Sequence, residues 1–446
     1  METPEQPGAA QASPAQADAP VRTMTPARRL KAILGGSAGN LVEWYDWFAY
    51  ASFALYFSKV FFPDGDQTAQ LLKTAAVFAV GFFARPVGAW IMGLYADRAG
   101  RRAAMTVSVA MMCLGSLIIA VAPGHATIGG AAPVVLLLAR LLQGLSVGGE
   151  YGASATYLSE TAGKSGRGFW SSFHYVTLIL GQLIALGVLI VLQRTLSPEA
   201  LQDWGWRVPF WIGAGLAVVV FWIRMGLEES QSFESAKGSG EKATSRLLFL
   251  KHPKETAMVV GLTSAGSLAF YAYTTYMQKY LVNSAGFDKN AATEIMTLAL
   301  FCFMLAQPAM GWLSDRLGRK RMLAAAFGIG ALMAWPVFTG LAATQDRLTA
   351  FAILFFALLV QSAYTSISAV VKAELFPTHV RALGVALPYA LGNAAFGGTA
   401  EYMALWFKDI GIEQGFFFYV SGMCAIAFLI ALFMRDTQAQ STILED

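Results

Sequence analysis

About twelve stretches of this chain are apolar over roughly the 20 residues that a helix needs to cross a bilayer. Hydrophobic residues make up 56% of the sequence and charged residues 13%, against about 25% charged in a soluble domain. Because lipid offers no hydrogen bonds to an exposed backbone, these stretches must be helical. The sequence predicts an all-α polytopic membrane protein with twelve transmembrane helices, near 33–60, 70–96, 103–123, 133–159, 168–193, 206–226, 256–282, 290–314, 321–342, 348–374, 382–407 and 415–434.

A short charged turn occurs twice, each time directly after an apolar stretch. The first copy is GLYADRAGRR at Gly93–Arg102, and the second is GWLSDRLGRK at Gly311–Lys320, about half the chain length later. The acid and arginine that bound Glu160–Arg167 are repeated at nearly the same offset in Glu374–Arg381. The chain is therefore predicted to be two pseudo-symmetric six-helix bundles, which is how many transporters with alternating access are built.

Polar segments divide the chain at its ends and near its middle. The first residues are rich in Pro, Ala and Gln and lack the apolar core of a signal peptide, so they predict a disordered cytoplasmic tail. A Ser-, Gly-, Glu- and Lys-rich stretch near the centre predicts a cytoplasmic linker. The predicted parts are a tail at 1–31, bundles at 32–226 and 255–434, the linker at 227–254, and a second cytoplasmic tail at 435–446.

Lysine and arginine predict the orientation in the membrane. If both termini are cytoplasmic, 21 of the 32 Lys and Arg residues lie in inner segments and eight in outer loops. That bias satisfies the positive-inside rule, so the chain is expected to be a multi-pass protein of a bacterial inner membrane with both termini inside. The net charge of +4 then reflects orientation in the bilayer rather than a nucleic-acid surface. We expect a monomer.

The sequence holds no pattern for a metal, a nucleotide or a catalytic nucleophile. The three cysteines, Cys113, Cys302 and Cys424, are isolated within apolar stretches and lack metal-ligand spacing. No Gly-rich loop ending in Lys-Ser or Lys-Thr is present to bind ATP phosphates. We therefore expect no metal, no cofactor and no enzymatic activity, and a proton gradient as the energy source.

Seven ionisable residues lie inside the apolar stretches. Each would cost roughly 2.5–3.5 kcal/mol if it faced lipid, so they must pair with one another or line water. Four are acids and three are bases, which is close to the balance that pairing requires. They are Glu43, Asp46, Arg85, Arg140, Glu150, Lys372 and Glu401.

Glu43 and Asp46 are three residues apart and therefore share one face of the first helix. Mutual repulsion favours protonation of one of them. Arg140, in the fourth apolar stretch, is the natural counter-charge. Two interpretations remain open for this set: a proton-coupling pair, in which protonation of Asp46 frees Arg140, and a static buried ion pair.

Arg85 lies 12 residues before Asp97, about 18 Å from the turn and near the membrane midplane. Its guanidinium is suited to a bidentate contact with a substrate carboxylate, and the alternative is a salt bridge to Glu43 or Glu150. Lys372 is shallower, and it is either a second carboxylate partner or a gate residue. A dianion needs at least two cationic contacts, and Arg85, Arg140 and Lys372 are the predicted buried candidates.

The repeated pattern G-x-x-x-D-R-x-G-R-[RK], together with RLLQGLSVGGE at Arg140–Glu150 and ELFPTHVRALG at Glu374–Gly384, resembles the major facilitator superfamily. Stretches such as GNLVEWYDW at Gly39–Trp47 and FGGTAEY at Phe396–Tyr402 resemble its metabolite:proton symporter family. The resemblance runs from about residue 30 to 433. It implies a proton symporter that imports an organic dicarboxylate, with 2-oxoglutarate as first candidate. The alternatives are shikimate, citrate, or a zwitterionic osmolyte such as proline or betaine.

The resemblance also carries site residues to this sequence. It implies proton coupling by Asp46 and Arg140, with Glu43 beside them. Substrate binding is expected from Arg85, Arg140 and Lys372 and from the cavity-lining positions Tyr175, Gln182, Tyr271 and Asn393, although each polar residue could instead make an interhelical hydrogen bond. The expected cytoplasmic gate consists of Gly93, Asp97, Arg98, Gly100, Arg101, Arg102, Glu160, Arg167, Gly311, Asp315, Arg316, Gly318, Arg319, Glu374 and Arg381.

Overall fold

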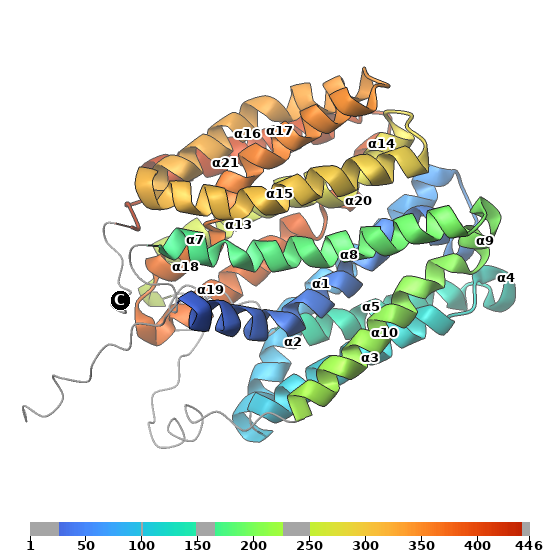
Figure 1. The fold of residues 1–446 in the computed structure, drawn as a ribbon, viewed down its shortest axis with the longest axis horizontal. Coiled ribbons are helices and arrows are strands. Elements are labelled where there is room, and N and C mark those ends of the chain that lie inside the picture. The colour runs from blue at the N-terminus through green and yellow to red at the C-terminus, as the bar shows by residue number, and fades with distance from the viewer. Residues whose placement is uncertain (1–25, 100, 149–165, 226–249, 439–446) are drawn as a thin grey trace, which may run out of the picture.

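The computed structural model describes residues 26–99, 101–148, 166–225 and 250–438, and within these ranges it consists of helices and connecting loops (Figure 1). The all-α prediction is confirmed. The long helices of the first half are α1 (Pro26–Phe61), α2 (Gln67–Ala99), α3 (Arg101–Val121), α5 (Ala131–Val147), α7 (Arg167–Ser171) continued by α8 (Phe173–Thr195), and α10 (Val208–Met225).

The second half repeats this arrangement, with several helices that are interrupted. Short elements at the loops of the first half are α4 (His125–Ile128), α9 (Pro198–Asp203) and η2 (Gly205–Arg207). The second half begins with one run made of α13 (Pro253–Tyr271), η3 (Ala272–Tyr276) and α14 (Met277–Asn283). It continues with α15 (Lys289–Leu317), α16 (Arg319–Ala342), and α17 (Arg347–Thr365) followed by α18 (Ser368–Leu375). A second run is made of α19 (Thr378–Gly392), η4 (Asn393–Gly397) and α20 (Ala400–Asp409), and the last helix is α21 (Gln414–Phe433).

Each of the twelve predicted apolar stretches overlaps one of these helical runs. Six runs in the described ranges are long and apolar enough to cross a membrane, and three shorter apolar helices accompany them. Two helices begin inside segments predicted to be polar: α1 begins at Pro26, within the predicted tail 1–31, and α13 begins at Pro253, within the predicted linker 227–254. Residues 1–25, 226–249 and 439–446, which hold most of the predicted tails and linker, lie outside the described residues.

Local sequence explains where several helices begin. The Asp288 carboxylate accepts hydrogen bonds from the backbone N–H groups of Asn290 and Ala291 at 2.9 and 3.0 Å, and so caps α15. Asp346 caps α17 in the same way, through the Thr349 N–H at 2.8 Å. Gly318 separates α15 from α16 with a φ of 93°, which glycine adopts without steric cost. The second copy of the repeated turn therefore depends on a glycine at this position.

The two halves pack against each other along their length. Within the first half, α1 packs on α8 and α2 packs on α5, and within the second half α16 packs on α21 and α15 on α17. Across the halves, α15 contacts α7 and α8, and α2 contacts α20. Figure 1 shows α8 in green beside α15 in yellow, running nearly parallel. Side chains of α1, α2, α5, α13 and α20 therefore meet at the centre of the molecule.

Candidate functional site

Two buried arginines share one aromatic ring at the centre of the first half. The guanidinium carbon of Arg85, on α2, lies 3.9 Å from the centroid of the Trp47 ring on α1. The guanidinium carbon of Arg140, on α5, lies at the same distance from that centroid. The two cations therefore cannot be further apart than twice this distance. Cation–π attraction offsets part of their desolvation, but their mutual repulsion remains.

Both arginines have hydrogen-bond donors with no partner among the described residues. The Nε and Nη2 atoms of Arg85 are unpaired, and so are the Nε and Nη2 atoms of Arg140. Arg85 is 6% exposed and Arg140 is fully buried. Buried polar groups are normally satisfied, and paired guanidinium N–H groups are what a carboxylate accepts from most strongly. The cluster is therefore suited to receiving carboxylates.

Asp46 and Arg140 are connected through Gln143 rather than directly. The Gln143 amide nitrogen donates to Asp46 Oδ2, and its oxygen accepts from Arg140 Nη1 at 2.7 Å. Ser116, on α3, donates its hydroxyl to Asp46 Oδ1 at 2.5 Å. All of these side chains are buried. Gln143 was missing from the predicted site, although its position three residues after Arg140 places it on the same helix face.

The second half reaches the arginine cluster through Tyr271 on α13. Its hydroxyl interacts with Arg85 and with the Asn393 side chain, and its ring packs edge-on against Phe82 at 5.2 Å between centroids. Asn393 is the first residue of η4, a π-helical segment. Such segments often mark functional positions, because they change the direction in which side chains point. Tyr271 thus interacts with both Arg85 and Asn393, and the cavity-lining role of Tyr271 and Asn393 stays a prediction.

Two other predicted residues connect the halves further along α8. Gln182 donates its amide N–H to the backbone oxygen of Thr274 in η3 at 3.0 Å. The Tyr175 ring packs edge-on against Phe270 at 5.7 Å, and its hydroxyl interacts with Ser368. Both side chains are buried. These contacts are interhelical packing and hydrogen bonds, which corresponds to the alternative left open from the sequence.

Glu43 and Lys372 are two further predicted charges that are buried. Glu43 lies on α1, one turn before Asp46, and its charge acts on Arg85. The Lys372 ammonium group donates to Ser368 Oγ at 2.8 Å and lies 4.3 Å from the centre of the Tyr389 ring. The charge of Arg85 also acts on Tyr389, so Lys372 and Arg85 interact with the same tyrosine.

Lys279 is a buried cation, and its inclusion among the eight outer-loop Lys and Arg residues predicted above is wrong. It is fully buried in α14, where its ammonium group donates to Glu401 Oε2 at 2.9 Å and to the Ala51 backbone oxygen at 2.8 Å. Because α14 continues to Asn283, Lys279 lies one turn inside the helix end. The sequence did contain a sign of this buried cation, because the predicted buried charges comprised four acids and only three bases. Lys279 supplies the fourth base.

The second repeated turn binds the two halves together at the end of the molecule where α7, α16 and α18 meet. The two carboxylate oxygens of Asp315 accept the backbone N–H groups of Gly168 and Phe169 at 2.8 and 3.0 Å. Arg319 donates to Asp315 at 2.8 Å. Gly311 approaches Gly168 so closely that a Cβ on Gly311 would lie 2.5 Å from the Gly168 backbone oxygen.

Glu374 completes this cluster from α18. Its carboxylate lies 3.8 Å from Arg167 and 3.9 Å from Arg319, so it connects the first half to the second. Arg381 is buried nearby and donates to the Phe376 backbone oxygen at 3.3 Å. We call Arg167, Asp315, Arg319 and Glu374 the charged lock.

Some predicted gate residues do not belong to the charged lock, and others lie outside the residues that the structure describes. Arg316 is exposed, and its guanidinium carbon lies 3.7 Å from the centre of the Trp312 ring. Gly318 supplies the turn between α15 and α16 rather than a contact. Gly93, Asp97 and Arg98 belong to α2, and Arg101 and Arg102 belong to α3, but the surroundings of these five side chains lie outside the described part of the structure. The gate candidates Gly100 and Glu160 lie entirely outside the described residues. The same holds for Glu150, one of the predicted buried charges.

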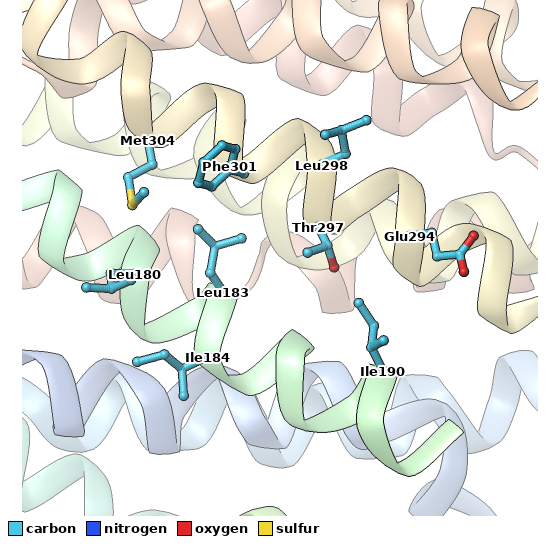
Figure 2. Close-up of a pocket in the computed structure, with 9 residues that line it drawn as sticks. All are labelled: Leu180, Leu183, Ile184, Ile190, Glu294, Thr297, Leu298, Phe301 and Met304. Carbon is cyan, nitrogen blue, oxygen red and sulfur yellow. The ribbon is translucent and has the colours of Figure 1, made fainter. Parts of the chain in front are cut away.

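A lateral groove of about 470 Å³ lies between α8 and α15 (Figure 2). Figure 2 shows Leu183 and Ile190 of α8 pointing toward Thr297 and Phe301 of α15. The lining is apolar except for Thr297 and Glu294 at one end. With a single acid and no cation among its lining residues, this groove does not suit an anionic solute.

Comparison with known proteins places the chain among transporters. The family model "Sugar (and other) transporter" matches residues 32–255 and 245–443. The alpha-ketoglutarate permease of Escherichia coli (strain K12) is 52% identical over 94% of this chain and 96% of its own length. The citrate-proton symporter of Salmonella typhi is 33% identical over 91% and 94%. A solved proton:xylose symporter of the major facilitator superfamily shares the fold, with a TM-score of 0.75 at 18% identity over 93% and 98%.

Proposed function

Because this chain belongs to the sugar (and other) transporter family, with the fold of the major facilitator superfamily, we propose that it imports an organic dicarboxylate by proton symport. The first candidate is 2-oxoglutarate, the substrate named for the 52% identical permease. The observation that carries the proposal is the pair of buried arginines on Trp47, with four guanidinium nitrogens unpaired among the described residues.

A dicarboxylate fits this pair better than a neutral or zwitterionic solute does. Two carboxylates neutralise two guanidinium groups and satisfy their free N–H donors in a buried site. A single carboxylate would leave one of the two arginines buried, charged and unneutralised, which costs several kcal/mol. Tyr271 beside Arg85 supplies a further hydroxyl contact for the solute. The proposed substrate contacts are Arg85, Arg140 and Tyr271, with Asn393 behind them.

The proton is proposed to bind at Asp46. This carboxylate is buried 3 residues from Glu43, and Arg140 contacts it only through Gln143. Protonation of Asp46 removes the charge that holds Arg140 toward it, and Arg140 then becomes available to the substrate. Binding of the proton and of the anion is thereby coupled. The proton gradient is the proposed energy source, and the cycle needs no cofactor.

Alternating access is proposed to act through two opposed closures. The charged lock joins the halves at one end, and at the other end Lys279, which pairs with Glu401 of its own half, joins them by its bond to Ala51 of the first half. Residues 32–226 and 255–434 are the bundles proposed to move against each other. We propose that the protein acts as a monomer in a bacterial inner membrane, with both termini and the charged lock on the cytoplasmic side.

Uptake into proteoliposomes tests the proposal. Purified full-length protein is reconstituted, a pH gradient is imposed, and accumulation of labelled 2-oxoglutarate is measured. Succinate, citrate, shikimate and betaine are added as competitors. We expect accumulation above equilibrium that collapses when an uncoupler dissipates the gradient, and competition by diacids. Uptake indifferent to the gradient would exclude symport, and competition by betaine but not by diacids would assign an osmolyte.

A further inference from the structure

We propose that Gln143 is the positioning residue that transmits the protonation state of Asp46 to Arg140, by rotation of its side-chain amide. This inference rests on the proposed function, because it concerns how proton binding and anion binding are coupled. Gln143 is fully buried between the two groups and contacts both. It touches no other titratable side chain in the described part of the chain.

With Asp46 ionised, only one orientation of the amide is compatible with both neighbours. A carboxylate can only accept hydrogen bonds, and a guanidinium can only donate them. The Gln143 nitrogen must therefore face Asp46 and its oxygen must face Arg140, which is the arrangement observed. The same nitrogen also lies 3.1 Å from Ser116 Oγ. In this state Gln143 holds one edge of the Arg140 guanidinium.

With Asp46 protonated, the preferred orientation reverses. When the proton binds at Oδ2, the new O–H faces Gln143, whose oxygen is then the acceptor on that side, while the Ser116 hydroxyl lies at Oδ1. Rotation of the amide brings its NH₂ group toward Arg140, where two donors face each other without an acceptor. Arg140 then loses its only hydrogen-bond partner among the described residues and turns its N–H groups to a substrate carboxylate. The proton and the anion thus favour the same arrangement.

The rotation needs little room, because turning the amide by half a turn exchanges its oxygen and nitrogen and leaves its outline almost unchanged. Gln143 packs closely against α3, since a Cβ at Gly115 would lie 2.6 Å from Gln143 Cγ. A Cβ at Gly213 on α10 would lie 2.6 Å from Asp46 Oδ1, which shows that the carboxylate is closely enclosed on that side. Two helix pairs therefore approach closely at these glycines, α3 with α5 at Gly115 and α10 with α1 at Gly213.

The other charged or titratable groups that face the Asp46–Arg140 unit belong to three elements. They are Glu43, Tyr45 and Tyr50 on α1, Arg85 on α2 and Cys113 on α3. Cys113 donates to the Ala214 backbone oxygen at 3.5 Å. α8 presents Gly181, which has no side chain, to the turn of α1 that holds Tyr45.

The test is the pH dependence of substrate binding. The affinity of full-length wild-type and variant proteins for 2-oxoglutarate is measured between pH 5.5 and 8.5, together with the protons taken up per substrate bound. In the pH range where Asp46 of the free wild-type protein is ionised, we expect the affinity for 2-oxoglutarate to rise about tenfold for each unit by which the pH is lowered. About one proton should be taken up for each substrate molecule bound. In Gln143→Leu we expect binding to persist, the slope to become flat and proton uptake to fall toward zero.

Ser116→Ala is the matched control, because Ser116 contacts the same carboxylate but not Arg140. We expect this variant to shift the midpoint of the pH dependence and to keep its slope. Gln143→Met, which is unbranched, replaces Gln143→Leu if that variant does not fold. A wild-type slope in either Gln143 variant would overturn the inference, since Asp46 and Arg140 would then communicate directly. Absence of 2-oxoglutarate binding by the wild type at every pH would refute the proposed function instead.

Discussion

At the scale of single residues, the most informative feature is the placement of two arginines over one tryptophan ring. Arg85 and Arg140 repel each other, and burial increases that repulsion because the local dielectric is low. The ring of Trp47, the hydroxyl of Tyr271 and the amide of Gln143 offset only part of the cost. In the proposed function, a bound dianion offsets the rest, so the charge of the two arginines favours an anionic ligand.

Arg85→Gln is expected to weaken 2-oxoglutarate uptake by raising KM about 10- to 100-fold, because a charged hydrogen bond to a carboxylate contributes roughly 1.5–3 kcal/mol. The measurement is the initial rate of uptake against concentration in proteoliposomes. Arg316→Gln is the control, since Arg316 is exposed and lies over Trp312, away from the two arginines. Equal KM values for Arg85→Gln and the wild type would argue against substrate contact.

Asp46→Asn is expected to abolish accumulation driven by a pH gradient while exchange of internal for external 2-oxoglutarate continues. The amide mimics the protonated acid, so Arg140 is free to bind substrate but no proton can be carried. Counterflow measured without a gradient distinguishes this result from a misfolded protein. If Asp46→Asn still accumulated substrate with the gradient, the proton would have to bind elsewhere.

At the scale of elements, contacts between helices of opposite halves determine which end is closed. The charged lock connects α7 to α15, α16 and α18, and the two glycines in α7 and α15 let the backbones approach. Lys279 connects α14 to α1 of the opposite half and pairs with Glu401 on α20 of its own half. These contacts are few and local, so a single side chain can change the balance between the two closures.

Gly311→Ala is expected to disfavour closure at the charged lock, because its Cβ would lie 2.5 Å from the Gly168 backbone oxygen, and backbone cannot move away cheaply. A single cysteine introduced at the lock should react faster with a thiol reagent in this variant than in the parent. Gly422→Ala is the control, as nothing lies within 4 Å of its added Cβ. An unchanged labelling rate in Gly311→Ala would mean that the glycine contact does not limit opening.

Lys279→Met is expected to be more destabilising than Lys279→Met combined with Glu401→Leu, because the single change leaves a buried carboxylate unpaired. Breaking one partner of a buried pair costs about 3–5 kcal/mol, and replacing both with apolar groups costs much less. Thermal unfolding of the purified proteins measures the difference. Lys289→Met is the comparison, since Lys289 donates to the Leu55 backbone oxygen at 3.1 Å and lacks a buried acid. Equal losses for single and double variants would refute the pair.

At the scale of the whole molecule, the described residues form two sets of helices that meet along a central plane (Figure 1). Contacts across this plane occur at both ends in the same structure, through the charged lock and through Lys279. The buried arginines lie between them. In the proposed alternating-access cycle, movement in either direction breaks one set of these contacts while the other remains.

The orientation of the whole molecule is a prediction from the lysine and arginine bias. A cysteine placed in the loop at Asp64–Asp66 should react with an impermeant thiol reagent in intact cells, and a cysteine near Asp436 should react only after the membrane is permeabilised. The native cysteines are first replaced by alanine or serine and uptake is rechecked. The reverse labelling pattern would place the termini, and with them the charged lock, outside.

The sequence alone determined the helical membrane fold, the internal duplication and the presence of buried charges, because hydropathy and repeated motifs are properties of neighbouring residues. Only the tertiary structure decided which charges meet. Lys279 pairs with Glu401, and Gln143 stands between Asp46 and Arg140, because partners on different helices depend on helix length, rotation and tilt. Lys279 lies within the apolar stretch near 256–282, but hydropathy does not show that Glu401, on another helix, neutralises it.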